Sequence, residues 1–359
     1  MLYLQIAFMV FIYVSIIVYG GTLMKQKVTL KDIALRAGTS VNSVSKAMRN
    51  HPKISEKKRR EILKLSEEMG YIPNYTAKYL RKRKTNLIGL IVGDNTNPYF
   101  ATTIKVVQTR LKEYGYYTLT FNNYENIEDE LGIITELCGL NVAGVLLTPA
   151  KSNQESAAML RRYHIPYVLM HRFYDSKTDN YVIADDELAG FLATSHLLER
   201  KPANILLINS IWDLTTAQFR KSGYKRALDS HDIHPNPEWI IDECVDRDHC
   251  YTIMRDFLKT HSPPFSVLCY SDYFATGALH AIIENKLRIP EDIAIIGIDD
   301  TDVMLNHSYG LTSISVPVCD IAVQSVDLLI KIIINQETGN ILPDQHIVLK
   351  PSLVTRNST

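Results

Sequence analysis

The sequence predicts a small helical head followed by a larger α/β body, and three observations support this division. Residues 28–49 contain two short amphipathic segments separated by a turn. From residue 85 onward, short apolar runs alternate with amphipathic segments, which is typical of parallel sheets covered by helices. Positive charge is concentrated before residue 85, although the chain of 359 residues has a formal net charge of zero.

The first predicted helix begins after Thr29, which is placed to cap it, with Asp32 three residues later in the capping-box position. Gly38 follows the helix and is suited to end it. The residues of its apolar stripe, at helical spacing, are Leu30, Ile33, Ala34 and Ala37. The sequence therefore predicts a short helix with one buried face.

The second predicted helix has Ser40 as its cap. Val44, Ala47 and Met48 are expected to face inward. The residues on the outward face are Asn42, Ser43, Ser45 and Lys46. A solvated helix face normally carries acidic side chains as well, and this face has none, which suits a helix seated in the major groove of DNA. The pattern predicts a helix-turn-helix, and the alternative is an ordinary helical hairpin in a globular core.

A third helix is predicted from Ser55 to Met69, with Ile62, Leu65 and Met69 in the core and basic residues at 57–60. Gly70 ends it. The segment 74–80 can form only two helical turns before a basic run at 81–84. So short a helix is marginal in water, and we expect it to need DNA or a dimer partner to fold.

The charge distribution agrees with a nucleic-acid-binding head. Between Lys25 and Lys84 there are 17 basic residues against 5 acidic ones, a net charge of +12. The remainder of the chain has 22 basic residues against 34 acidic ones, a net charge of −12. A solvated basic linker would explain the charge but not the helical periodicity within it.

The body, residues 85–359, is long enough for two domains. Ligands of parallel α/β sheets bind beyond the carboxyl ends of the strands, so polar residues just after predicted strands are candidate ligand contacts. Together with Tyr99 and Phe100, which open the helix after the first strand, and Arg220, which lies near a helix start, the candidates are Asp94, Asn95, Tyr99, Phe100, His171, Arg172, Arg220, Tyr270, Asp272 and Asp299. Carboxylates, guanidinium groups and aromatic rings are what a polyhydroxylated ligand needs. Each could instead be a helix cap or a loop ion pair, and Asp186 and Asp300 are at least as suited to a structural role.

The sequence resembles the lactose-repressor (LacI) family of transcription factors over nearly all of its length after Met24, and three stretches carry the resemblance most clearly. The stretches are TLKDIALRAGTSVNSVSKAM, ISEKKRREIL and MGYIPNYTAKYLRKRKTNLIGLIV. The resemblance implies a hinge helix at 74–81 whose Leu80 inserts into a base step of the operator and kinks the duplex. A simple hydrophobic contact between hinge and core is the alternative role for Leu80.

The resemblance also assigns contacts with double-stranded operator DNA, with base reading expected at Val41, Asn42 and Lys46. The candidate DNA-binding residues are Thr29, Ser40, Val41, Asn42, Ser43, Ser45, Lys46, Asn74, Ala77, Leu80 and Arg81. Phosphate contacts would supply most of the affinity, and the second helix would supply base choice. The family usually has arginine where Lys46 stands, which puts a bidentate contact with guanine in doubt.

For the body, the resemblance implies a periplasmic-binding-protein-like architecture of two parallel-sheet subdomains around a cleft, with three chain crossings near Asp185, Ser315 and Pro343. The expected divisions are an apolar segment at 1–23, a head at 24–73, a hinge and linker at 74–84, and a body at 85–359. The first subdomain would span about 85–185 and 316–342, and the second about 186–315 and 343–359.

Within the cleft, the family contacts its effector most often at the positions of Asp94, Tyr99, Arg172, Arg220 and Asp272. The family usually has aspartate where His171 stands, so we expect the effector to differ from a common sugar. Trp212, in the loop before Arg220, could cover a ligand or make an apolar contact.

The function predicted on this basis is transcriptional regulation by a homodimeric repressor with a sugar or sugar-like effector. No sequence motif of a hydrolase, nucleotide-binding loop, zinc protease or dinucleotide site is present, so no enzyme activity and no cofactor are predicted. The histidines and cysteines between 231 and 250 fit no compact zinc signature, so no metal is predicted. Two rivals are an extracytoplasmic solute-binding protein and a sugar-modifying enzyme, and neither explains the basic head.

Residues 1–19 carry no charge and are nearly long enough to cross a bilayer. A membrane-tethered regulator is one interpretation, and a secretory signal is disfavoured because no positive segment precedes the apolar run. We favour a third interpretation, in which Met24 is the true start, residues 1–23 are translated noncoding sequence and the protein is cytoplasmic. The codons for Gly20 and Gly21 test it, since a ribosome-binding site would read GGAGG there.

Overall fold

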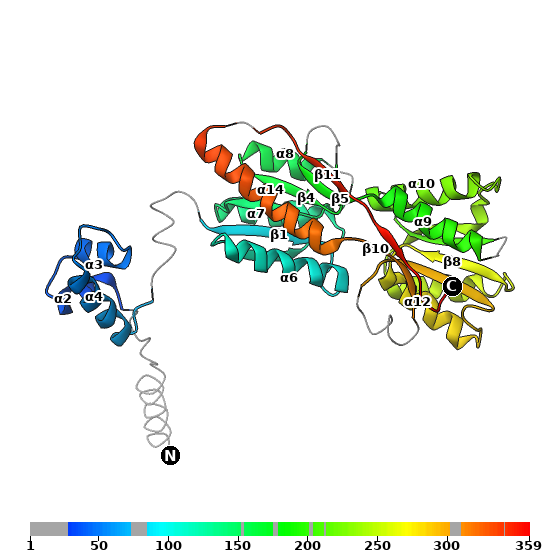
Figure 1. Ribbon diagram of the computed structural model, residues 1–359, viewed down its shortest axis with the longest axis horizontal. Helices are drawn as coiled ribbons and strands as arrows, with labels where there is room; N and C mark the ends of the chain where they lie inside the picture. The colour runs from blue at the N-terminus through cyan, green and yellow to red at the C-terminus, as the bar shows by residue number, and fades with distance from the viewer. Residues whose placement is uncertain are drawn as a thin grey trace, which may run out of the picture. The chain divides into compact units, whose positions relative to one another are not determined.

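The computed structural model describes residues 28–72, 85–151, 154–174, 179–200, 204–211, 213–301, 310–340 and 342–359 (Figure 1). The chain forms two compact units, residues 1–82 and 83–359, which are referred to below as the head and the body. Within the described ranges, no helix combines the length and apolar character needed to cross a membrane.

The head consists of helices α2 (Leu30–Arg36), α3 (Val41–Met48) and α4 (Glu56–Glu68). The Thr29 side chain accepts a hydrogen bond from the Asp32 amide, and the Asp32 carboxylate accepts one from the Thr29 amide at 2.8 Å, which completes the expected capping box. Ser40 caps α3 and Ser55 caps α4, as the sequence predicts. Gly38 and Gly70 both have positive φ values, so each ends its helix in a conformation that favours glycine.

The core of the head is small and purely aliphatic. It is formed by six side chains, which are Ile33 and Ala34 of α2, Ala37 at the C-cap of α2, Val44 and Ala47 of α3, and Ile62 of α4. The Lys58 ammonium donates to the Ala37 carbonyl at 3.1 Å and so satisfies a free carbonyl at the end of α2. This core fixes α3 with its polar face outward.

The body contains two six-stranded sheets. The first has the strand order β11-β5-β4-β3-β1-β2 and is parallel throughout. Its strands are β1 (Leu87–Val92), β2 (Tyr117–Asn122), β3 (Gly144–Leu147), β4 (Tyr167–Met170), β5 (Tyr181–Ala184) and β11 (His346–Leu349). The central strands read as continuous apolar runs because helices cover both faces.

The second sheet has the order β12-β10-β9-β8-β6-β7. Its strands are β6 (Ile205–Ser210), β7 (Ile240–Cys244), β8 (Phe265–Cys269), β9 (Ile293–Asp299), β10 (Thr312–Ser315) and β12 (Ser352–Val354). Five strands are parallel, and the edge strand β12 pairs with β10 in the antiparallel direction. The sequence predicts the two-sheet architecture but not this reversed edge.

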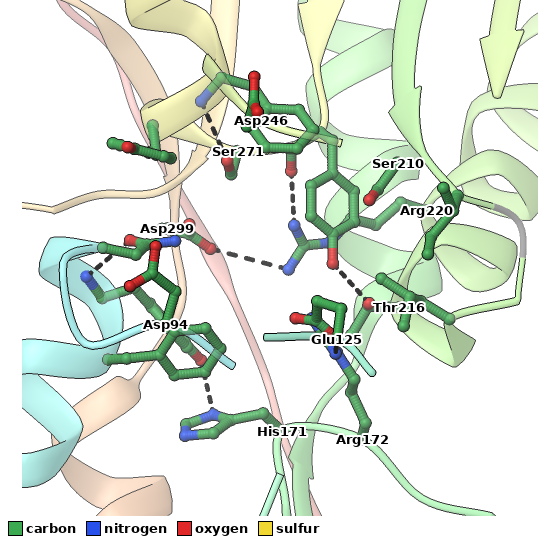
Figure 2. A pocket seen from close by; sticks show the side chains of 18 of the residues that line it. Asp94, Glu125, His171, Arg172, Ser210, Thr216, Arg220, Asp246, Ser271 and Asp299 are labelled. Carbon is green, nitrogen blue, oxygen red and sulfur yellow. Dashed lines mark hydrogen bonds and ion pairs between the residues drawn. The ribbon is translucent and has the colours of Figure 1, made fainter. Parts of the chain in front are cut away.

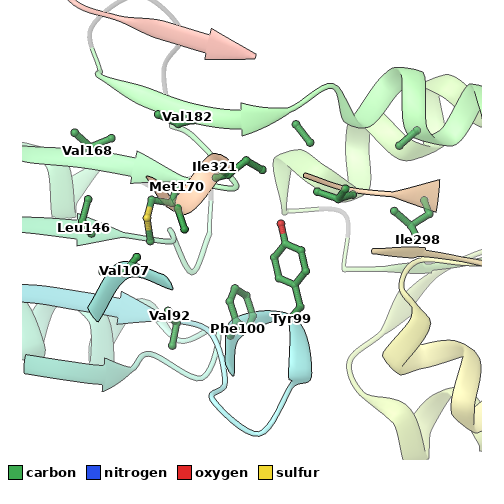
Figure 3. Close-up of a cluster of buried hydrophobic side chains, with 14 of the residues drawn as sticks. Val92, Tyr99, Phe100, Val107, Leu146, Val168, Met170, Val182, Ile298 and Ile321 are labelled. Carbon is green, nitrogen blue, oxygen red and sulfur yellow. The ribbon is translucent and has the colours of Figure 1, made fainter. Parts of the chain in front are cut away.

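Helices cover both faces of each sheet (Figure 1). The first sheet carries α6 (Pro98–Glu113), α7 (Ile127–Gly139), α8 (Glu155–Arg162) and α14 (Val318–Thr338). The second carries α9 (Asp186–Glu199), α10 (Thr215–Asp229), α11 (Arg247–Phe257), α12 (Asp272–Glu284) and the short 3-10 helix η1 (Pro237–Trp239). Figure 3 shows a buried cluster that includes Val92, Leu146, Val168 and Ile321, with Tyr99 and Phe100 at one side of it.

The chain passes between the two sheets three times. The first crossing follows β5 at Asp185, and the second follows β10 at residues 316–317, both where the sequence predicts them. The third was expected near Pro343 and lies instead at residues 350–351, because β11 pairs with β5 of the first sheet before the chain reaches β12. Residues 343–349 therefore belong to the first subdomain.

The last residues of the chain are packed into the second subdomain. Ser358 is fully buried, and its hydroxyl donates to the Ile295 carbonyl at 2.6 Å and accepts from the Thr312 amide. The Thr359 hydroxyl lies 2.7 Å from Nε2 of His196. The C-terminal segment thereby joins β9, β10 and α9.

Candidate functional site

A cavity of about 370 Å³ lies between the two subdomains of the body, beyond the carboxyl ends of the strands. Figure 2 shows side chains from both subdomains converging on it. Loops after β1, β2, β3 and β4 form the wall on the first subdomain, here called the N wall. The starts of α9, α10 and α12 with the ends of β6, β7, β8 and β9 form the opposite C wall. The volume suits a small organic molecule.

Arg220 of α10 is the central charge of the C wall (Figure 2). Its Nε donates to Oδ1 of Asp186 at 2.8 Å, and its Nη1 donates to the Tyr270 carbonyl at 2.5 Å. The remaining nitrogen, Nη2, lies 3.7 Å from Oδ1 of Asp299, and the guanidinium carbon lies 4.6 Å from the centre of the Tyr270 ring. The side chains of Arg220, Asp186 and Asp299 are each no more than 7% exposed, so these charges interact with little screening by water.

Two glycines allow Arg220 to reach Asp186. A Cβ atom at Gly190 of α9 would overlap the backbone carbonyl of Arg220, and one at Gly223 of α10 would overlap that of Glu187. The two helices therefore cross at a separation that only glycine permits at these positions. This close crossing places the guanidinium on α10 beside the first residue of α9.

The carboxyl groups around Arg220 favour protonation. Burial raises the pKa of Asp186, although the charge of Arg220 opposes the shift. Burial raises the pKa of Asp299 well above its usual range, with Arg220 opposing and Asp272 and Asp186 adding to the rise. One guanidinium therefore faces two buried carboxyl groups whose pKa values are both raised by burial.

The N wall carries a second arginine, which is held by a different arrangement. Both terminal nitrogens of Arg172 donate to the Glu125 carboxylate, at 2.5 and 3.0 Å, and one of them also donates to the Pro149 carbonyl at 3.0 Å. Arg172 is buried, whereas the Glu125 side chain is 30% exposed. This bidentate pair joins the loops that follow β2, β3 and β4.

His171 lies beside this pair and contacts α6. Its Nδ1 lies 2.7 Å from the Tyr99 hydroxyl, and its Nε2 lies 3.2 Å from the Thr103 hydroxyl. Burial and the positive charges of Arg172 and Arg220 lower the pKa of His171 to about 3, so the ring is neutral near pH 7. The residue has a φ of +66°, a left-handed conformation that turns the chain sharply after β4.

Eight of the ten effector contacts predicted from the sequence line the cavity: Asp94, Tyr99, Phe100, His171, Arg172, Arg220, Tyr270 and Asp299. Asn95 does not, because it is held by hydrogen bonds to Asn122 at the end of β2. Asp272 also does not, because it is turned toward Gly297 and accepts hydrogen bonds from the Ser313 hydroxyl and the Thr301 amide. These two residues do not line the cavity, and an effector contact at either of them stays a prediction.

Other lining residues were not identified from the sequence. Among them are Tyr124, Glu125, Lys151, Thr216 and Asp246. Glu125 and Lys151 follow β2 and β3, so a scan of every strand end would have found them. Asp186, for which a structural role was equally expected, both lines the cavity and pairs with Arg220. Asp300 pairs with Arg356 outside the cavity, and Trp212 lies outside the described residues.

The described residues among those predicted to bind DNA are all exposed or half-buried. Thr29, Ser40, Val41 and Asn42 are exposed, and Ser43, Ser45 and Lys46 are half-buried. Val41 exposes 45% of its surface, although it is apolar and the adjacent Val44 position is fully buried. Asn74, Ala77, Leu80 and Arg81 lie outside the described residues, as do residues 1–27.

Two family models match the chain, one on each side of the linker. Residues 29–74 match the model described as bacterial regulatory proteins, lacI family, and residues 194–359 match a periplasmic binding protein-like domain. The "probable HTH-type transcriptional repressor ExuR" of Bacillus subtilis is 31% identical over 316 residues, covering 87% of this chain and 93% of the relative. The chain belongs to the LacI family. It is accordingly a DNA-binding transcriptional regulator with an effector-binding body.

Other members of the LacI family align over similar lengths. The HTH-type transcriptional regulator GalR of Escherichia coli is 29% identical over 330 residues, covering 92% of this chain and 95% of the relative. Among solved structures, a complex of the transcriptional regulator CelR with cellobiose has a TM-score of 0.70 at 25% identity and covers 93% of this chain and all of that one. A Lac repressor structure with bound ONPG has a TM-score of 0.81 at 22% identity, covering 93% and 100%, which shows the shared fold.

Proposed function

We propose that this LacI-family regulator is a cytoplasmic homodimer that represses transcription by binding a near-palindromic operator, and that a neutral sugar-like effector in the cleft changes its operator affinity. In this arrangement, two copies of α3 occupy successive major-groove half-sites. The observation that carries the proposal is the pairing of an acid-free polar helix face on a basic head with a polar cleft in an acidic body.

The outward face of α3 supports the proposed binding of DNA. Asn42 and Lys46 are placed one helical turn apart and offer amide and ammonium groups suited to base edges. Val41 offers an apolar surface of the kind that contacts the methyl group of thymine. Glu56 is the first acidic residue after this face, at the start of α4, so the face presents no charge that would repel phosphate.

The lining of the cleft supports a neutral polyhydroxylated effector. Arg172 is already neutralised by Glu125, and Arg220 by Asp186, so neither guanidinium requires an anionic ligand. Guanidinium, carboxyl and hydroxyl groups nonetheless project from both walls, and the Tyr270 ring provides a flat apolar surface. The relative CelR was solved with cellobiose, which is consistent with a sugar-like molecule.

The regulatory step follows from the position of the cleft between two subdomains joined by three crossings. An effector that contacts both walls stabilises one angle between the subdomains over another and so transmits its presence along the body. A coupling free energy of about 1 to 3 kcal/mol is typical of such linkage and would change operator affinity by roughly five- to 150-fold.

The DNA arm is tested by fluorescence anisotropy with promoter fragments that adjoin the gene for this protein. Lys46→Ala should weaken binding and lower the slope of log affinity against log salt by about 2, because the dimer loses one cation from each of its two copies of α3. Lys64→Ala is the matched control, since this lysine lies on α4 with a side chain that is 79% exposed and pairs with Glu68. Absence of binding at low salt by the unaltered chain would contradict the proposal.

The effector arm is tested by thermal unfolding of the full chain with D-glucose, D-galactose, D-mannose and cellobiose, together with their phosphates. A neutral sugar that binds the cleft should raise the unfolding temperature in a concentration-dependent manner. A sugar phosphate that outperforms every neutral sugar would contradict the assignment of a neutral effector. Sedimentation equilibrium of the same samples tests the dimer.

A further inference from the structure

His171 occupies a cleft position at which both of its ring nitrogens are already engaged by the protein. Nδ1 meets the Tyr99 hydroxyl and Nε2 meets the Thr103 hydroxyl, and the residue is 6% exposed. The ring also packs edge-on against Tyr99 and Phe100, with ring centres 4.9 and 6.1 Å apart. Neither nitrogen is therefore free to bind a molecule in the cleft.

The direction of each hydrogen bond follows from the single proton of the Thr103 hydroxyl. This hydroxyl lies 3.2 Å from the Tyr99 carbonyl, one helical turn earlier, where it can only donate. The Thr103 oxygen also lies 3.2 Å from Nε2 of His171, and all three contacts are made at once only if its proton goes to the carbonyl and it accepts from a hydrogen on Nε2. A neutral imidazole has one N–H, so Nδ1 is a bare acceptor, and the Tyr99 hydroxyl must donate to it.

Tyr99 also faces the cleft. It is the second residue of α6 and lines the cavity. Burial raises the pKa of Tyr99 well above its usual range, with Asp299 and Asp186 of the C wall adding to the rise, so these carboxyls act on it across the cleft. The phenol therefore keeps its proton for the contact with Nδ1 of His171.

We infer that His171 is a positioning residue that orients the Tyr99 hydroxyl so that its oxygen offers only lone pairs to the cleft. The effector must then present a hydroxyl or amine hydrogen at this point, and an ether, carbonyl or fluorine there would find no donor in Tyr99. The inference concerns the specificity of the effector site and rests on the proposed function for its biological meaning. The proton arrangement itself can be measured without DNA or effector.

The decisive measurement is the tautomer of His171 in the full-length chain, from solid-state NMR spectra of protein labelled with ¹⁵N in histidine. Protonated and bare ring nitrogens have widely separated ¹⁵N shifts, and the signals lost in His171→Gln identify this residue among the eleven histidines. We expect a single neutral form at pH 7 with the proton on Nε2. A proton on Nδ1, or on both nitrogens, would overturn the inference.

Variants of Thr103 separate the proposed control of the proton from simple packing. Thr103→Val keeps the shape of the side chain but removes the acceptor, so a form with the proton on Nδ1 should appear. Thr103→Ser keeps the hydroxyl and should retain the original form. If Thr103→Val leaves the spectrum of His171 unchanged, Thr103 does not set the tautomer, and the proposed series of hydrogen bonds from Thr103 through His171 to Tyr99 is wrong.

The consequence for specificity is tested with whichever of the four neutral sugars named above raises the unfolding temperature most, compared with its monodeoxy derivatives. One derivative should bind the unaltered protein about tenfold more weakly than the parent sugar and bind Tyr99→Phe with the same affinity as the parent sugar. Discrimination that persists in Tyr99→Phe for every derivative would overturn the inference. Failure of all four sugars to bind would instead contradict the proposed function, while the NMR result would stand.

Discussion

The two walls of the cleft hold their charges in different ways. On the C wall, the guanidinium of Arg220 contacts two carboxyl groups, and the three side chains are almost completely buried. On the N wall, Arg172 is buried but its partner Glu125 remains partly exposed to water, and the adjacent His171 is neutral. The C wall is therefore a low-dielectric cluster that depends on one cation, whereas the N wall distributes its interactions among separate groups.

This difference indicates a division of roles between the subdomains. A cluster that depends on one buried cation is rigid and fails as a unit when that cation is removed. A wall built from separate hydrogen bonds tolerates the loss of one of them. We therefore expect the C wall to maintain the architecture of the cleft and the N wall to contribute more of the selectivity.

The largest expected effect is on the C wall. Arg220→Met should lower the free energy of unfolding by about 3 to 5 kcal/mol, because the buried carboxyl groups of Asp186 and Asp299 lose the cation that they pair with directly. The control is Arg226→Met on the same helix, where an arginine that is 49% exposed pairs with Glu187 and should contribute less than about 1 kcal/mol. Urea denaturation measures both variants, and similar losses would remove the distinction between buried cluster and surface pair.

A pH effect is expected on the N wall. Because burial beside Arg172 and Arg220 lowers the pKa of His171 to about 3 from 6.5, its contribution to stability is complete above pH 6.5 and is lost as the pH falls toward 3. The stability advantage of the unaltered chain over His171→Gln should therefore shrink by about 2 kcal/mol between pH 7 and pH 5. An advantage that is constant over this range, measured by urea denaturation, would mean that His171 is not held neutral.

The smallest expected effect concerns the ion pair of the N wall. Glu125→Gln should lower the free energy of unfolding by about 1 kcal/mol, since Arg172 keeps its bond to the Pro149 carbonyl and water reaches the partly exposed site. Raising the salt concentration should reduce this difference further. A loss comparable with that of Arg220→Met would show that both walls behave as single cooperative clusters.

Local signals in the sequence predict the head accurately. The caps at Thr29, Ser40 and Ser55 and the stops at Gly38 and Gly70 all act on backbone groups within a few residues, so they can be identified without knowledge of distant contacts. The alternation of apolar runs and amphipathic helices predicts the two sheets of the body for the same reason.

The cleft residues are only partly predictable, because following a strand does not determine where a side chain points. Asp272 comes just after β8, as Tyr270 does, yet its carboxyl turns into the space left by Gly297 and bonds to Ser313 of β10. Asn95 is likewise drawn to Asn122 on the neighbouring strand. Such partners are remote in the sequence, and only the folded arrangement identifies them.

The third crossing was misplaced for a related reason. β11 has only four residues and half of them are exposed, so nothing in its sequence distinguishes an edge strand of the first sheet from one of the second. Glu125 lies in the turn that follows β2, and nothing near it in the sequence indicates its partner. Its importance comes from Arg172, which is 47 residues away in the sequence.

The burial of Ser358 and Thr359 has a practical consequence for the experiments described above. An affinity tag or fluorophore attached directly to Thr359 would have to displace hydroxyl groups that join the chain end to His196, Ile295 and Thr312. Such an attachment would loosen the same subdomain that carries Arg220, and a change in sugar binding could then be mistaken for an effect of mutation. Labels are better placed on exposed side chains of the body, such as Lys331 on the outer side of α14.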